Sequence, residues 1–188
     1  KSSVVRAGLI PALRRGAVSS SADWFIVEMI PGTHPLEELE ASLLRIAVNP
    51  PASLLEQLEK DERGLVRALK RVLPQDGSEL LLVIDQFEEL FTLVEDPAER
   101  EAFIDLLLTA LSDVRSQLRL VVTLRADFTD RPLQYVDFGE LVRKRTEFIL
   151  PLGADELVEA ITWPVNQLGM TLETGLTAQI IHDVGDEP

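Results

Sequence analysis

The sequence contains no cysteine, few aromatic residues and little positive charge. Without cysteine it has neither a disulfide framework nor a metal site built from thiolates. Its 18 lysines and arginines are outnumbered by 32 acidic residues, and the net charge of −14 argues against a nucleic-acid-binding surface. No apolar run approaches the roughly 18 residues of a membrane span, and no signal peptide is evident. These absences predict a cytoplasmic module that contacts neither membrane nor nucleic acid.

The content of apolar residues is sufficient for one domain with a core, at 46% of 188 residues. Five of them are consecutive, at positions 80–84, and Asp85, Glu88 and Glu89 follow at once. So short a run is typical of a strand buried on both faces of a parallel sheet. Open α/β sheets bind ligands at the carboxyl ends of their strands. The sequence therefore predicts that the acidic residues lie at a ligand-binding edge.

These acids have the residue types that phosphate chemistry requires. A carboxylate such as Asp85 can hold Mg²⁺ or its water shell, and a second carboxylate can orient a water for attack on a phosphate. The pattern is that of a Walker B strand followed by a catalytic acid. The alternative interpretation is a core strand that enters a helix, with acids favoured by the positive end of the helix dipole.

The first residues, Lys1-Ser2-Ser3, match the end of the P-loop motif G-x-x-x-x-G-K-[ST]. A helix is expected over residues 3–13 and is closed by Gly16. The strand and the glycines that precede such a lysine are absent from this sequence. We therefore expect a domain trimmed at its start, which does not by itself bind nucleotide tightly.

A second apolar strand, residues 118–124, is followed by Arg125. In a parallel sheet Arg125 would lie at the same edge as Asp85, where a guanidinium can stabilise phosphate charge. The alternative is a surface arginine that pairs with Asp127 or Asp130.

Strand-like and helix-like patterns alternate along the chain, which predicts a parallel sheet with right-handed crossovers. Further strands are expected over 24–30 and 146–150. Helices are expected over 33–48, 53–73 with a break at 61–64, 87–93, 97–111, 138–143, 155–168 and 174–184. A boundary near residues 151–153 would separate the sheet domain from a helical lid.

Several stretches, taken in chain order, resemble the STAND branch of P-loop NTPases, and most closely the bacterial novel STAND NTPase domain. They are residues 1–9 (KSSVVRAGL), 83–91 (VIDQFEELF), 121–128 (VVTLRADF), 145–152 (RTEFILPL) and 185–188 (GDEP). The resemblance covers essentially the whole chain. It implies a three-layer αβα P-loop NTPase core over residues 1–152, without its first strand and most of its P-loop, and the start of a helical lid over residues 153–188.

The resemblance also implies a role for individual residues. They are Lys1, Ser2 and Ser3 for nucleotide binding, Ser2 and Asp85 for the metal, Glu88 or Glu89 as the catalytic acid, and Arg125 as the sensor arginine. Glu89 is favoured slightly over Glu88 by its place in the Asp-x-x-acid-Glu pattern of related signalling NTPases.

The function implied by the resemblance is that of a signalling switch. ATP or GTP would bind with Mg²⁺ between the sheet domain and the lid and would be hydrolysed slowly. The expected partners are the nucleotide, other copies of the domain, and sensor repeats and an effector domain fused in the same polypeptide. The alternative is a scaffold or oligomerisation module that has the same fold but no hydrolysis.

The resemblance further implies a strand order. The strand before Asp85 should lie between the strands of Val27 and Val122. The strand of Phe148 should stand apart from that of Val122, across a gap that the absent first strand would fill.

Overall fold

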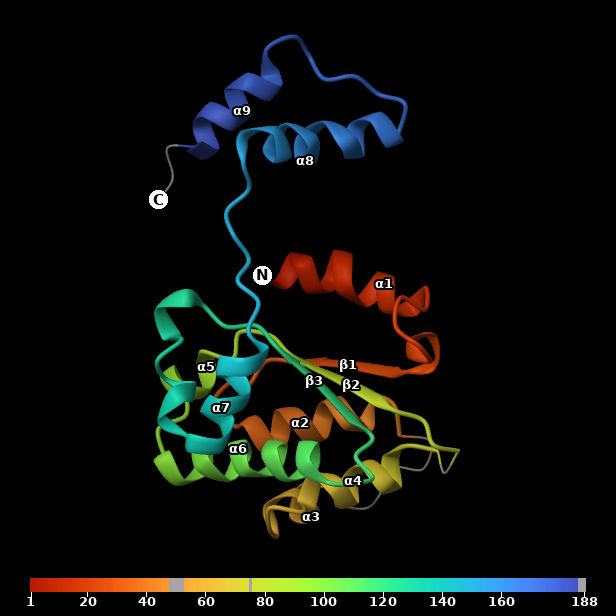
Figure 1. The fold of residues 1–188 in the computed structure, drawn as a ribbon, viewed down its shortest axis with the longest axis vertical. Coiled ribbons are helices and arrows are strands. Elements are labelled where there is room, and N and C mark those ends of the chain that lie inside the picture. The colour runs from red at the N-terminus through yellow and green to blue at the C-terminus, as the bar shows by residue number, and fades with distance from the viewer. Residues whose placement is uncertain (48–52, 75, 186–188) are drawn as a thin grey trace. The chain divides into compact units, whose positions relative to one another are not determined.

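The computed structural model describes residues 1–47, 53–74 and 76–185 (Figure 1). The chain forms two compact units, Lys1–Thr146 and Glu147–Pro188. The first unit contains the sheet. In the second, the helices α8 (Ala154–Gln167) and α9 (Leu176–Gly185) contact each other. The assignment of residues 1–152 as an NTPase core and 153–188 as a lid stays a prediction.

The sheet of the first unit has three parallel strands in the order β1-β2-β3. They are β1 (Phe25–Met29), β2 (Leu80–Ile84) and β3 (Leu118–Val122). In the register, Leu82 lies beside Val27 on one side and Leu120 on the other. All five residues of β2 are buried, as the apolar run predicts. The predicted place of the strand before Asp85, between those of Val27 and Val122, is confirmed.

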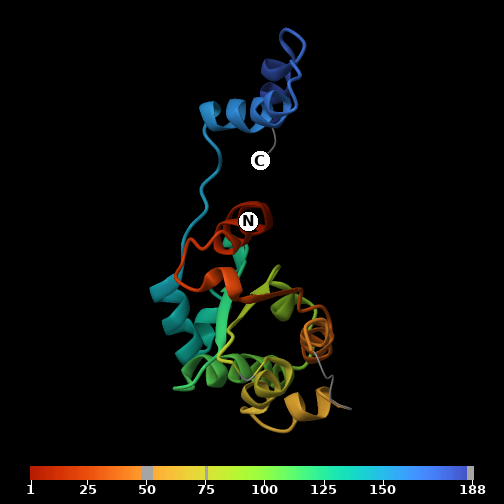
Figure 2. The ribbon, with the colours of Figure 1, turned by 90° about the vertical axis from the view of Figure 1, so that its right-hand side faces the viewer.

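Alternate residues of β2 contribute to different parts of the core, because successive side chains of a strand point to opposite faces. Leu81 and Val83 pack with the first helical segment, whereas Leu80, Leu82 and Ile84 belong to the larger cluster. The first helical segment covers one face, and the other helices of this unit lie on the opposite side of the sheet or near its ends (Figures 1 and 2). The described part of the chain therefore has helices on both faces of an open α/β sheet.

The helical segments of the first unit follow the predicted ranges closely. The first segment is a π-helix, Val4–Leu9, continued by α1 (Ile10–Arg14) and followed by Gly16 at φ +79°. The others are α2 (Pro35–Leu44), α3 (Leu55–Glu59), α4 (Gly64–Val72), α5 (Glu89–Thr92), α6 (Pro97–Ser112), α7 (Val136–Arg145), and three short 3₁₀ turns at Ser21–Asp23, Ala126–Phe128 and Pro132–Gln134. No helix in the described ranges is long and apolar enough to cross a membrane.

The predicted strand over residues 146–150 is wrong. The structure assigns no regular structure there, and the side chains of Phe148 and Leu150 are 71% and 77% exposed. A strand needs a neighbour for its backbone hydrogen bonds, and no described segment pairs with this one. The gap predicted beside it therefore has no strand on its far side. Residue 48, where a helix was expected to end, and residues 186–188 of the family-like terminus lie outside the described residues.

Candidate functional site

The candidate site lies at the carboxyl ends of β2 and β3. The ladder continues one residue beyond the strands, because the N–H of Asp85 donates to the carbonyl of Met29 at 2.9 Å and the N–H of Thr123 to that of Ile84 at 2.9 Å. This places Asp85 and Thr123 at the same edge of the sheet. The start of the chain reaches this edge as well, since Lys1 and Ser2 both contact residues that follow β2.

The carboxylate of Asp85 is the centre of the site, and the residue is buried, with 4% exposure. Its Oδ1 accepts three hydrogen bonds, from Ser2 Oγ at 2.7 Å, from Thr123 Oγ1 at 2.5 Å and from the N–H of Gln86 at 3.1 Å. Its Oδ2 lies 3.4 Å from a terminal guanidinium nitrogen of Arg6. The charge of this buried carboxylate is therefore balanced on both oxygens.

These contacts keep Asp85 ionised. Burial alone raises the pKa of its carboxyl, but hydrogen bonds from Thr123 and Ser2 outweigh that effect. The N–H of Gln86 and the charge of Arg6 act in the same direction, so the pKa lies below its ordinary value. Asp85 is consequently an anion at neutral pH.

A second carboxylate, Glu88, is also buried at this edge, with 9% exposure. Its Oε1 pairs with Lys1 Nζ at 3.2 Å, and its Oε2 accepts from the backbone N–H of Arg125 at 3.3 Å. Glu88 thus joins the start of the chain to the segment that follows β3.

The guanidinium of Arg125 is bound by Asp127, which raises its pKa, and the charge of Glu88 acts in the same direction. It donates to Asp127 at 3.0 and 2.8 Å and lies over the ring of Phe128, with its central carbon 5.8 Å from the ring centroid. This is the surface pair considered as the alternative from the sequence. The structure brings the backbone of Arg125 to the site, and a sensor role for its side chain stays a prediction.

The remaining predicted residues lie at the margin of the site. Glu89 Oε2 accepts from the N–H of Gly32, which follows β1, at 3.3 Å. Ser3 is exposed in the first helical turn. The structure therefore brings together Lys1, Ser2, Asp85, Glu88 and the backbone of Arg125, with Glu89 on the side of β1.

Three further residues contact Asp85 that the sequence did not identify as site residues. Thr123 could have been recognised from the sequence, because it is a polar residue that ends an apolar strand. The sequence evidence for Arg6 was weaker: it stands four residues after Ser2 and so lies on the same helix face. Gln86 could not have been recognised from the sequence, because its positive φ of +53° does not follow from its residue type.

The backbone of Gln86 gives a first testable prediction. Its N–H donates hydrogen bonds to both Asp85 Oδ1 and Thr123 Oγ1, at 3.1 Å each. The residue has a left-handed backbone conformation, which disfavours side chains branched at Cβ. Gln86→Val should lower the free energy of unfolding by about 1 kcal/mol, measured by chemical denaturation. Gln86→Gly, which removes the steric penalty, is the control and should lose less. Equal losses would contradict this account of the turn.

The residues around Asp85 suit magnesium. Mg²⁺ in phosphate sites keeps several waters and uses one or two carboxylates together with the substrate phosphates. No group of three or more histidine or acidic side chains that could hold a metal ion occurs among the described residues. The Ser2 hydroxyl donates its proton to Asp85, and this leaves its oxygen lone pairs for a cation. The Ser2 hydroxyl and the Asp85 carboxylate are hard oxygen donors held side by side by their hydrogen bond, and they therefore fit Mg²⁺.

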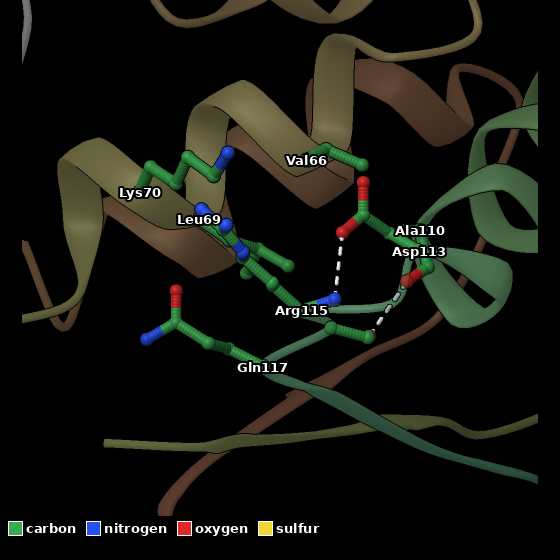
Figure 3. A pocket seen from close by; sticks show the side chains of 8 residues that line it. Val66, Leu69, Lys70, Ala110, Asp113, Arg115 and Gln117 are labelled. Carbon is green, nitrogen blue, oxygen red and sulfur yellow. Dashed lines mark hydrogen bonds between the residues drawn. The ribbon is translucent and has the colours of Figure 1, made fainter. Parts of the chain in front are cut away.

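A small pocket elsewhere does not belong to this site. Figure 3 shows it near α4 and the residues that precede β3, hence at the opposite end of the strands from Asp85. Its polar groups bond within the protein: Asp113 accepts from Arg115 N and pairs with Arg63, and Gln117 donates to the Ser78 carbonyl. These bonds hold the connection between α6 and β3.

The open parallel sheet with helices on both faces, and the polar residues collected at its carboxyl edge, are compatible with an α/β NTPase-like fold. The model of a protein family described as Novel STAND NTPase 1 matches residues 1–188, and the chain belongs to this family. The resemblance drawn from the sequence is thereby confirmed. Comparisons with curated proteins and with solved structures found no match.

Proposed function

We propose that this domain is a nucleotide-binding signalling switch that binds ATP or GTP with Mg²⁺ and hydrolyses it slowly, as part of a larger multidomain STAND protein. One observation carries the proposal. Ser2 and Asp85 are 83 residues apart in the sequence, yet their side chains are hydrogen-bonded at 2.7 Å at the carboxyl edge of a parallel sheet. This is the pair of residue types that holds a magnesium ion beside nucleotide phosphates.

The roles of the residues follow from their charges and contacts. Lys1 would pair with phosphate oxygens, for which its ammonium must leave Glu88, now 3.2 Å away. Ser2 and Asp85 would hold Mg²⁺, and Thr123 keeps the Asp85 carboxylate fixed by its hydrogen bond. When bound, the ion supplies positive charge that offsets the negative charge of the phosphates. Arg125 would have to exchange Asp127 for phosphate in order to act as a sensor.

The two candidate catalytic acids have different contacts, which makes them separable by mutation. Glu88 pairs with Lys1, so it would be released when Lys1 turns to phosphate. Glu89 accepts from the backbone of Gly32 and is positioned independently of Lys1. Whichever acid orients the attacking water acts on hydrolysis and leaves nucleotide binding in place.

Glu88→Gln and Glu89→Gln should therefore separate binding from hydrolysis in the intact protein. The variant of the acid that orients water should lose about 100-fold or more in phosphate release while it still binds nucleotide. Both quantities are measured with and without Mg²⁺. Glu79→Gln is the matched control: Glu79 precedes β2, pairs with Arg119 and lies at the other end of the strand from Asp85. It should behave as the wild type.

If both glutamine variants hydrolyse nucleotide normally, the catalytic assignment is wrong and the alternative function is favoured. That alternative is a scaffold or oligomerisation module without hydrolysis.

The proposal also includes self-association through this domain and control by fused sensor repeats and an effector domain. Self-association and control by fused domains are proposed because the chain belongs to the STAND family. The bound nucleotide would favour one conformation of the domain over another.

A further inference from the structure

The two oxygens of Asp85 have unequal surroundings. Oδ1 accepts from Ser2, Thr123 and the N–H of Gln86, so its lone pairs are fully used. Among the described residues, Oδ2 has one polar contact, with Arg6 at 3.4 Å. A metal ion or a metal-bound water that approaches Asp85 must therefore use Oδ2, and it meets Arg6 there.

Arg6 is held in this position from a second side. Its Nε donates to Glu28 Oε2 at 2.7 Å, while its terminal nitrogen faces Asp85. Glu28 belongs to β1 and stands beside Val83 of β2, so the guanidinium bridges two neighbouring strands. Arg6 itself lies in the π-helical segment Val4–Leu9, a local irregularity that is frequent at functional sites.

We propose that Arg6 is a positioning residue that sets the Mg²⁺ concentration at which the site works; this rests on the proposed function. Its permanent positive charge occupies the open side of Asp85 and repels a second cation. Phosphate groups of a nucleotide offset that repulsion, so Arg6 makes Mg²⁺ binding depend on nucleotide. The guanidinium contacts Glu28 and Asp85 and makes no hydrogen bond or ion pair with Lys1 or Glu88, so its effect should fall on the metal.

A magnesium titration tests the role of Arg6. In the intact protein at a fixed concentration of a fluorescent ATP or GTP analogue, Arg6→Gln should lower the half-saturating Mg²⁺ concentration for nucleotide binding about two- to fivefold, as expected for a half-exposed ion pair. Arg6→Lys keeps the charge and should restore most of the wild-type value.

Arg119→Gln is the matched control. Arg119 is as exposed as Arg6, with 56% against 53% of its side chain accessible, and it also pairs with a glutamate, Glu79, but at the amino end of β2. Its replacement should leave the magnesium titration unchanged. Arg119 also lies over the ring of Trp24, so the stability of both variants is measured in parallel, and a change in the magnesium titration confined to Arg6→Gln isolates the effect on the metal.

The outcomes separate this inference from the proposed function. If wild type and Arg6→Gln bind nucleotide with the same half-saturating Mg²⁺ concentration, Arg6 does not have this role, and the proposed switch function is unaffected. Wild-type protein without Mg²⁺-dependent binding overturns both. A double-mutant cycle with Arg6→Gln and Asp85→Asn, measured by denaturation without nucleotide, tests the contact itself, and zero coupling would overturn it.

Discussion

Asp85→Asn should weaken Mg²⁺-dependent nucleotide binding by the intact protein about 10- to 100-fold and should leave the weak binding without Mg²⁺ unchanged. The amide keeps the size of the side chain and an oxygen that can accept from Ser2 and Thr123. It loses the negative charge that those hydrogen bonds stabilise at neutral pH. Because the charge holds the cation, the loss should appear only in the measurement with metal present.

A folding defect could imitate this result, so stability is measured in parallel. Asparagine accepts weaker hydrogen bonds than a carboxylate, and the variant should lose about 1 to 3 kcal/mol of stability in denaturation without nucleotide. Glu79→Gln, at the other end of β2, is the control and should retain Mg²⁺-dependent binding. If Asp85→Asn binds nucleotide with Mg²⁺ as tightly as wild type, Asp85 does not hold the metal and the proposed function fails.

The sheet and the convergence of the site could be predicted because they depend on simple patterns. The run 80–84 has no polar residue, which favours a strand buried on both faces, and the family resemblance implied its place between the other two strands. Parallel strands then bring Asp85 and the end of β3 to one edge. The P-loop motif led us to expect Lys1 and Ser2 near this edge, whereas their pairing with Glu88 and Asp85 is seen in the structure.

The rest depends on contacts that periodicity does not encode. The apolar pattern of residues 146–150 is compatible with a strand, but pattern alone cannot supply a hydrogen-bonding neighbour. The orientation of Arg125 depends on whether its guanidinium finds Asp127 or a phosphate, and both carry negative charge. The bridge from Arg6 to Glu28 and Asp85 requires the register of three segments at once.

Two phenylalanines test this distinction between pattern and packing. Phe87 lies in the turn between Asp85 and Glu88 and is completely buried, with its ring 5.7 Å from that of Phe91 and 5.5 Å from that of Phe138. Phe148 stands in the apolar segment 146–150 but is mostly exposed. Phe87 begins the predicted helix 87–93, and Phe148 lies in the predicted strand 146–150.

Phe87→Ala should therefore lower the free energy of unfolding by about 3 to 5 kcal/mol, and Phe148→Ala should change it by less than about 0.5 kcal/mol. The measurement is chemical denaturation followed by the fluorescence of Trp24, which is in the first unit, with Trp163 replaced by Phe in all samples. Phe87→Ala should also weaken nucleotide binding in the intact protein, because its ring anchors the turn that carries Asp85 and Glu88. A loss for Phe148→Ala as large as that for Phe87→Ala would mean that residues 146–150 are packed as a strand after all, and the sequence pattern would be the better guide there.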